Sequence, residues 1–454
     1  MAEETSTELL GPLFASEAMI AVFSDRGRLQ AMLDFELGLA RAEAEVGLIP
    51  AAAVAPIAAA AKAGRLDIAA LARQAAEAGI PTIPLVKQLT ALVAAEDAAA
   101  ARFVHWGATS QDVMDTGLVL QIGKALAVLK PELQRLSAAL ARLAESQART
   151  AMIGRTWLQH AVPVTFGLKA AGWLDALERC RLRLEEAGEA ARVLQFGGAA
   201  GTLATLGARG LEVAEALARV LDLRLPALPW HASRDRLVAL AAALALLVGV
   251  LGKMARDLSL MMQVEVAEAF EPSAPGRGGS STMPHKRNPA ASAVALAAAI
   301  RVPGIVATLL AAMPQEHERG LGGWQAEWET LPKTFLLASG SLGAMTEAME
   351  GIRLDPQRMR ANIDATRGLV MAEAVMMALA EKIGRLQAHD LVEAACHRAV
   401  AGGAHLKDVL ARDPAVAAEL DAGQLARLFA PEAYLGAAEG FVQRVLAAYR
   451  NKKE

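Results

Sequence analysis

The stretch Leu237–Gly252, LVALAAALALLVGVLG, runs for sixteen residues without a charged side chain. A helix that is apolar on all of its faces is either buried in protein or embedded in lipid. A membrane-spanning helix needs about 20 such residues, whereas this stretch continues into a segment at 253–270 that carries five charges. We therefore expect one helix over about 233–270, buried in the middle of a helical bundle.

Helical patterns also lie on both sides of this segment. Leucines at positions 126, 129, 133, 136, 140 and 143 recur at steps of three and four, and so form one apolar seam, with Pro131 expected to kink or restart the helix. Further helices are expected over 24–46, ending at Gly47, over about 164–194, and over 291–313, bent at Pro303. Only 4% of the residues are aromatic, and Ala and Leu are abundant, so the sequence predicts an all-α fold.

The composition narrows the class of protein. The net charge is −3, so no overall basic surface indicates binding to nucleic acid or to an anionic membrane. The two cysteines, Cys180 and Cys396, have no CxxC or CxxH spacing, which fits a reducing compartment and offers no metal site. The first residues, MAEETSTELLG, lack the basic and then apolar pattern of a signal peptide. We expect a cytoplasmic protein.

The chain of 454 residues is long enough for two or three domains. The segment LDPQRMRAN at 354–362 is a candidate boundary, because shorter helices with Gly and Pro breaks follow it. We expect three domains: an N-terminal helical domain over 1–112, a central long-helix bundle over 113–355 and a C-terminal helical domain over 356–454. The central helices carry more apolar surface than one chain can bury, so helices from several subunits are expected to share one core.

Four polar stretches interrupt this apolar pattern: GRGGSSTMPHKRNP (276–289), VHWGATSQDVMDT (104–116), GRTWLQHAVP (154–163) and QEHERGLGGWQAEWETLP (315–332). Each of the last three has a structural explanation, respectively a helix N-cap, a hydrogen-bonded core histidine, and packing of a Trp pair. Their conjunction places hydroxyls, imidazoles and cations in several breaks of one bundle, which favours an active site. No P-loop, HExxH or GxSxG motif is present, and GGAAGT at 197–202 is expected to be a small-residue turn.

The sequence GGSSTMPHKRNP resembles the signature loop of the fumarase/aspartase superfamily, here placed at 275–289. All the fixed positions of that pattern are met, by Gly279, Ser280, Ser281, Met283, Pro284, Lys286, Asn288 and Pro289. HWGATSQD and GRTWLQHAVP are similar to the other two motif regions, in the same order. The resemblance implies a homotetramer with a twenty-helix core, active sites shared among subunits, and no metal or organic cofactor.

The resemblance also implies roles for individual residues. Ser280 accepts or donates the proton at the α carbon of a carboxylate, and Lys286 with the loop amides would stabilise its alkoxide. Candidate substrate-binding residues are Thr109, Ser110, Thr156, Gln159, His160, Ser281, Asn288 and Arg319, since carboxylates need cationic or hydroxyl partners.

One position departs from the lyases of this superfamily. They have Gly-Arg-Thr-His where this chain has GRTW, so Trp157 stands in place of the proton-donating histidine. Trp cannot transfer protons, which favours a leaving group that needs none, such as a carboxylate, whose conjugate acid has a pKa of about 4. The resemblance to a cycloisomerase branch therefore predicts that a small tricarboxylate adds one carboxylate to its own double bond.

Two alternatives remain open. His160 would share a helix face with Trp157 if the segment were helical, and could then supply the missing proton in an adenylosuccinate-lyase-like C–N lyase. A binding or supporting role for His160 is favoured. A non-catalytic descendant of the fold would predict decay of the signature loop, whereas here the loop is complete.

Overall fold

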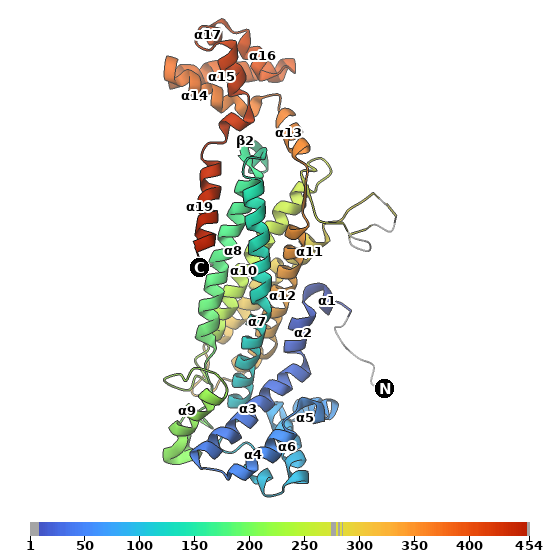
Figure 1. Ribbon diagram of the computed structural model, residues 1–454, viewed down its shortest axis with the longest axis vertical. Coiled ribbons are helices and arrows are strands. Elements are labelled where there is room, and N and C mark those ends of the chain that lie inside the picture. The colour runs from blue at the N-terminus through green and yellow to red at the C-terminus, as the bar shows by residue number, and fades with distance from the viewer. Residues whose placement is uncertain (1–8, 274–277, 280–281, 284, 452–454) are drawn as a thin grey trace. The chain divides into compact units, whose positions relative to one another are not determined.

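The computed structural model describes residues 9–273, 278–279, 282–283 and 285–451. Within them almost all regular structure is helical, which confirms the all-α fold class (Figure 1). The α-helices are α1 (Gly11–Phe14), α2 (Glu17–Phe23), α3 (Asp25–Val46), α4 (Val54–Ala60), α5 (Ile68–Ala78), α6 (Thr82–Glu96), α7 (Ser110–Ser146), α8 (Phe166–Ala191), α9 (Gly210–Val220), α10 (Asp235–Met261), α11 (Ala290–Ala312), α12 (Gly323–Glu350), α13 (Pro356–Asp364), α14 (Ala372–Ile383), α15 (Arg385–Gly402), α16 (Leu406–Ala411), α17 (Pro414–Ala417), α18 (Ala422–Leu428) and α19 (Ala438–Asn451). The strands are β1 (Ala151–Thr156), β2 (Gln159–Thr165), β3 (Ala269–Phe270) and β4 (Arg353–Leu354).

The described residues form two compact units. The first comprises the residues up to Leu133, Cys180–Gly252 and Val294–Ala344, and the second comprises Gln134–Arg179, Lys253–Ala293 and the residues from Met345 onward. The division falls inside α7, α8, α10, α11 and α12, so each of these long helices contributes to both units. The three domains expected over 1–112, 113–355 and 356–454 stay a prediction.

Helix α10 is a core helix, as its uninterrupted apolar sequence predicts. Leu240, Leu244, Leu247 and Leu251 are fully buried. By length and composition alone, α10 and α11 are both apolar enough to cross a membrane, but most of the apolar window of α10 is buried inside the protein. The charged continuation of α10 and its burial agree with a place in a protein core.

The expectation that this helix reaches residue 270 is wrong, because it ends at Met261. Ala267 takes a left-handed backbone conformation with φ of 53°, which a continuous helix excludes. The N–H of Glu268 then donates to the carbonyl of Met261 (3.0 Å). This turn leads the chain into β3, which pairs antiparallel with β4.

The prolines inside α7 and α11 do not interrupt those helices. Helix α7 continues through Pro131, so the alternative of a restart there is wrong, and α11 continues through Pro303. A proline removes one hydrogen bond of the helical ladder. In α7 the buried Leu129, Leu133 and Leu136 on both sides of Pro131 supply packing that offsets this loss.

The local sequence accounts for both ends of α3. The hydroxyl of Ser24 accepts a hydrogen bond from the N–H of Gly27 (3.0 Å) and so caps the first turn. At the other end Gly47 takes φ of 78°, the left-handed conformation that ends helices, as the sequence predicts. Helix α3 packs against α9 in the first unit (Figure 1).

A carboxyl group is buried in this part of the core. Glu43 on α3 is fully buried, and neither of its carboxyl oxygens has a hydrogen-bond partner in the part of the chain that the structure describes. Burial, together with the neighbouring carboxylate of Glu36, raises the pKa of Glu43 to about 9. Glu43 is therefore protonated in the folded protein at neutral pH.

We expect Glu43→Gln to stabilise the protein at pH 8 more than at pH 5. Unfolded, the carboxyl titrates near 4.5, and folded it titrates at about 9, so folding takes up a proton between these values. The stability that the protonated form contributes is complete below pH 4.5 and is lost as the pH rises toward 9, by at most about 1.4 kcal/mol per pH unit. Urea denaturation of both proteins at pH 5, 6.5 and 8 measures this.

The control for this prediction is Glu45→Gln, on the same helix. Glu45 is exposed and pairs with Arg219 at the surface (2.7 Å). Its substitution should change the unfolding free energy by less than about 1 kcal/mol, and equally at each pH. Parallel pH profiles for wild type and Glu43→Gln would contradict the protonated state of Glu43.

In the second unit, a separate hydrophobic cluster forms where the short helices α14 to α18 pack on one another (Figure 1). Its fully buried members include Val375, Leu379, Leu406 and Leu410. Capping side chains begin several of these helices, for example Asp421 with Gln424 at α18. Short helices with capped ends agree with the Gly and Pro breaks in the sequence beyond residue 356.

Candidate functional site

The candidate residues from the sequence divide between the two units. Thr109, Ser110 and Arg319 lie in the first unit, and the second holds Thr156, Gln159, His160, Lys286 and Asn288. Ser280 and Ser281 lie outside the described residues.

In the first unit, Thr109 and Ser110 begin α7, where both are half-buried. The carboxylate of Asp112 accepts a hydrogen bond from the N–H of Thr109 (3.1 Å), so an acidic side chain in the first turn fixes the start of the helix. The N-cap interpretation of ATSQD, with a hydroxyl of Thr109 or Ser110 as the cap, stays a prediction, and so does the candidate binding role of these two residues.

Asp112 also holds the small-residue turn at 197–202. Its carboxylate oxygens accept hydrogen bonds from the N–H groups of Gly197 (3.0 Å) and Gly198 (2.9 Å), and from Nε2 of His231 (2.9 Å). A Cβ at Gly197 would lie 2.8 Å from the side chain of Pro229, so only glycine fits there. GGAAGT is a turn in the structure, as the sequence predicts.

His105 lies just before these residues in the chain and contacts a buried carboxylate. Its Nδ1 is 2.7 Å from Oε1 of Glu36. Burial alone would lower the pKa of His105, but the carboxylates of Glu36 and Asp112 raise it above its usual value. Of this pair, the sequence identified His105 as part of a motif, whereas Glu36 was missed because it lies among the apolar residues of α3.

Arg319 lies next to the small-residue turn. Its guanidinium donates to the carbonyl of Ala199 (3.0 Å), while its Nε is buried and makes no hydrogen bond within the described residues. The protein thus satisfies part of the guanidinium and fixes it beside the turn. The structure brings together Thr109, Asp112, the turn at 197–202 and Arg319.

In the second unit, the GRTW motif forms a hairpin. Strands β1 and β2 pair antiparallel, with Thr156 opposite Gln159 and Arg155 opposite His160. Trp157 and Leu158 make the two-residue turn, with φ of 53° and 64° and exposed fractions of 97% and 76%. The segment is therefore not helical, so the condition under which His160 would share a helix face with Trp157 is not met: His160 lies across the ladder from Arg155.

The sequence contains no usual signal for this hairpin. A two-residue turn with both residues left-handed normally has Asn-Gly or Asp-Gly, since larger side chains are strained in that conformation. Here both positions carry large apolar side chains. Thr156, Gln159 and His160 are all exposed near the tip and open to a ligand.

Arg155 of the same motif does not face solvent as a free cation. Its guanidinium forms two hydrogen bonds to the fully buried carboxylate of Glu268 (2.7 and 2.9 Å). The side chain of Asn362 on α13 donates to the same carboxylate (2.8 Å). Because Glu268 neutralises its charge, Arg155 anchors the hairpin and is not a candidate partner for a substrate carboxylate.

Lys286 and Asn288 line an open groove with a volume of about 1360 Å³. Lys286 is exposed, and Asn288 is half-buried. His285, Arg287 and Arg353 also line this groove, against one carboxylate among its lining residues, that of Asp355. The cationic character of the groove suits an anionic ligand.

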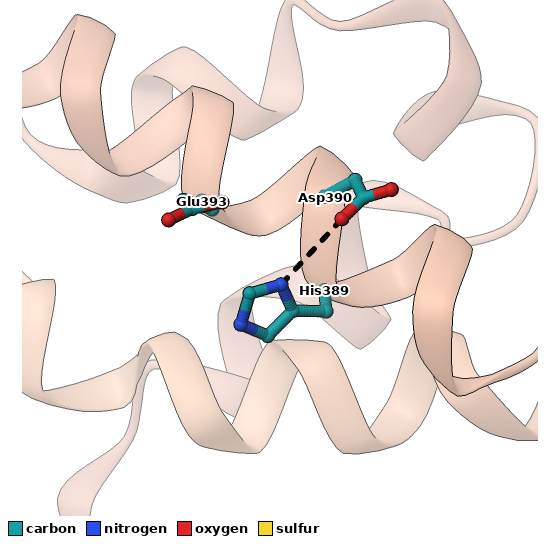
Figure 2. Close-up of side chains that lie close together, drawn as sticks. All are labelled: His389, Asp390 and Glu393. Atoms are coloured by element: carbon teal, nitrogen blue, oxygen red, sulfur yellow. Dashed lines mark ion pairs between the residues drawn. The ribbon is translucent and has the colours of Figure 1, made fainter.

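Among the described residues, one group of side chains has a spacing that could hold a metal ion, namely His389, Asp390 and Glu393 on α15 (Figure 2). All three are exposed, and Nδ1 of His389 is 3.6 Å from a carboxylate oxygen of Asp390. None belongs to the sequence motifs. Exposed acidic groups at helical spacing are ordinary on a solvated helix face, so this group is not a candidate active site.

Comparisons with known proteins agree with the motifs. A family of proteins described as lyases matches residues 14–304, and the family described as the adenylosuccinate lyase C-terminus matches residues 368–445. The 3-carboxy-cis,cis-muconate cycloisomerase of Pseudomonas aeruginosa is 57% identical over 449 residues, which cover 99% of this chain and 98% of that protein. The enzyme of the same name from Bradyrhizobium diazoefficiens is 56% identical, over 96% of this chain and 97% of that protein.

A solved structure is similar over the same length. The crystal structure of the 3-carboxy-cis,cis-muconate lactonizing enzyme of Pseudomonas putida superposes with a TM-score of 0.95 and 52% sequence identity. The superposition covers 98% of this chain and all of that one. The chain belongs to the lyase family, and so to the fumarase/aspartase superfamily that its signature loop resembles.

Proposed function

We propose that this chain converts 3-carboxy-cis,cis-muconate to a carboxymuconolactone, as a cycloisomerase of the protocatechuate branch of the β-ketoadipate pathway. The observation that carries the proposal is the similarity to cycloisomerases of that name over practically the whole chain, at 56% and 57% identity. The exposed Trp157 at the hairpin tip supports it, because no proton donor stands at that position.

The reaction is an isomerisation, so every atom of the substrate stays in the product. One carboxylate oxygen of the substrate attacks a carbon of the double bond, and the lactone C–O bond forms. Negative charge moves to the carbon next to another carboxylate, and Ser280 delivers the proton there. In the reverse direction the leaving group is a carboxylate, which is stable without protonation at neutral pH.

The developing charge needs stabilisation. Lys286, Asn288 and the amides of the signature loop are suited to hold it, each donor contributing roughly 3 kcal/mol as in other oxyanion sites. Lys286 is exposed on the cationic groove, and so is accessible to a carboxylate. Other carboxylates of the substrate would be bound by a second set of side chains, namely Thr109, Ser110, Thr156, Gln159, His160, Ser281 and Arg319.

The protein is proposed to be a cytoplasmic homotetramer whose subunits share one helical core and whose active sites draw residues from more than one subunit. Helix α11 supports this, since only 28% of its apolar window is buried and Ile300 is 75% exposed. An apolar helix with this exposure favours burial against further copies of the chain. The proposed reaction requires no metal or organic cofactor.

An adenylosuccinate-lyase-like C–N lyase is the second candidate. The match of residues 368–445 to the adenylosuccinate lyase C-terminus favours it. Cleavage of a C–N bond requires protonation of the departing amine, and the exposed His160 is the imidazole nearest to Trp157 in the sequence.

The experiment that tests the proposal compares two substrates. Purified protein is mixed with 3-carboxy-cis,cis-muconate, and separately with adenylosuccinate, and ultraviolet absorbance is followed with and without a chelator. Loss of the diene absorbance, unaffected by the chelator, is the expected result. Cleavage of adenylosuccinate with no change in the diene would overturn the proposal and assign the missing proton to a histidine.

A further inference from the structure

The base of the signature loop is closed by one buried carboxylate, that of Glu271, whose residue is 5% exposed. One oxygen, Oε2, accepts a hydrogen bond from the N–H of Ala291 (2.9 Å). The other, Oε1, accepts from both the N–H (2.8 Å) and the hydroxyl (2.7 Å) of Ser292. Glu271 thus joins the residue before the loop to the first turn of α11, across the nineteen residues 272–290.

The chain that leads into Glu271 is firmly attached to the second unit. Strand β3 pairs with β4 immediately before it. The carbonyl of Glu268 accepts from the N–H of Asp355 (3.0 Å), and the carboxylate of Glu268 is held by Arg155 and Asn362. Glu271 therefore extends from a fixed support.

A hydrogen bond also joins the end of the signature loop to a residue near the beginning of the loop. The N–H of Asn288 donates to the carbonyl of Gly278 (2.8 Å). Gly278 has φ of 64°, and a Cβ there would lie 2.6 Å from the carbonyl oxygen of Asn288, so this approach requires glycine. Hydrogen bonds therefore join the two ends of the loop at two places. Glu271 bonds to Ala291 and Ser292 at the outer ends, and Gly278 bonds to Asn288 further into the loop.

We propose that Glu271 is a positioning residue of the reaction. The carboxylate fixes the start of α11 next to β3. It thereby places Asn288, which precedes the first residue of α11 by two positions, and Lys286, which lies two positions before Asn288. Through Asn288 it also fixes Gly278, two residues before Ser280 in the sequence. Two N–H groups and a hydroxyl bonded to a buried carboxylate form a stiff joint, since bonds to an ionised acceptor are stronger than neutral ones.

This inference rests on the proposed function, because the positioned groups are those assigned to the cycloisomerase reaction. The inference goes beyond the proposed function, since Glu271 lies outside the signature pattern. A purely structural cap would stabilise α11 and leave the chemistry of each folded molecule unchanged. A positioning residue changes turnover in molecules that remain folded.

The test is Glu271→Gln in the full-length protein. The amide keeps the shape of the side chain but turns one acceptor into a donor that faces a backbone N–H. We expect kcat to fall on the order of 100-fold, as for a displacement of about 1 Å in a catalytic group, with a smaller change in KM. Trypsin should cleave after Lys286 and Arg287 faster than in the wild type, while other sites are cleaved at unchanged rates.

The matched control is Glu178→Gln in the same unit. Glu178 is also 5% exposed, and its Oε1 accepts a hydrogen bond from the hydroxyl of Ser137 (2.6 Å). This substitution repeats the chemistry of Glu271→Gln in α8, away from the signature loop in sequence. It should lower the thermal midpoint but leave kcat and cleavage after Lys286 unchanged.

Equal kcat and equal cleavage after Lys286 in the two variants would overturn the inference. If Glu271→Gln does not fold, Ser292→Ala and Glu271→Asp take its place, since each weakens the joint and keeps a carboxylate there. Wild-type kcat and cleavage in both of these would overturn it as well. Failure of the proposed function can be told apart from failure of this inference. In the first case the wild type would leave 3-carboxy-cis,cis-muconate unchanged, while the rates of trypsin cleavage would still report on the role of Glu271.

Discussion

Replacing Ser280 by alanine should lower kcat for 3-carboxy-cis,cis-muconate by roughly 10³- to 10⁴-fold, the upper range for loss of a general acid or base. The substrate contacts assigned to Lys286, Asn288 and Arg319 remain in the variant, so KM should change much less. Gly279 and Thr282, on either side of the serine pair, are exposed. We therefore expect the thermal midpoint and the oligomeric state to stay as in the wild type.

The measurement for Ser280→Ala is steady-state turnover followed by loss of the diene absorbance, together with thermal unfolding of the same samples. Ser281→Ala is the neighbouring control, since it removes a hydroxyl assigned to binding and should raise KM more than it lowers kcat. A Ser280→Ala protein with more than about a tenth of wild-type kcat would show that this hydroxyl does not move the proton. Equal loss of folding and activity would count against a catalytic role in the same way.

Replacing Arg234 by methionine should destabilise the protein by about 3–5 kcal/mol, the range found when one partner of a buried ion pair is removed. The guanidinium is buried between the carboxylates of Asp115 (2.7 Å) and Glu327 (2.5 Å). It also lies over the ring of Trp230, 4.8 Å from its centre. Without Arg234, two buried carboxylates face each other with no cation between them.

The loss of unfolding free energy in Arg234→Met should be larger at pH 8 than at pH 5.5. Burial already raises the pKa of Glu327, against the opposite effect of Arg234. Without the cation, the pKa of Glu327 in the folded state rises further above its unfolded value. Folding then takes up protons at neutral pH, and stability falls as the pH rises.

Urea denaturation of Arg234→Met at the two pH values tests this prediction, with Arg65→Met as the matched control. Arg65 forms an ion pair of similar length with Glu96 (2.6 Å), but both side chains are more than one-third exposed. Its removal should cost less than about 1 kcal/mol. Similar losses in the two variants would mean that burial of Arg234 does not set the strength of its interactions.

Much of the fold was predictable from stretches of consecutive residues. The apolar run at 237–252 predicted a buried core helix, the leucine seam predicted α7, and Gly47 predicted the end of α3. Helix caps and the 3.6-residue period act over a few residues, so a single segment contains them. The same holds for GGSSTMPHKRNP, which identified the superfamily from twelve neighbouring residues.

The end of α10 and the hairpin at 151–165 were not predictable in this way. Residues 262–268 have an acceptable helical composition, but Glu268 turns inward to pair with Arg155, which is 113 positions away. The hairpin turn at Trp157 and Leu158 uses residues that are strained there, so the tertiary structure overrides the local preference.

For the candidate site, the sequence by itself determined which residue types are available: the signature loop with Ser280 and Lys286, the GRTW motif with Trp157, and the hydroxyls that begin α7. Only the tertiary structure decided which charges are already neutralised, as in Arg155 with Glu268. It also decided which carboxylates hold two distant segments together by accepting backbone hydrogen bonds, as Asp112 and Glu271 do. The physical reason is that a charge in the sequence has no partner until folding brings it one. Asp112 meets Gly197 across 85 positions, and burial then decides whether that contact is worth a fraction of a kcal/mol or several.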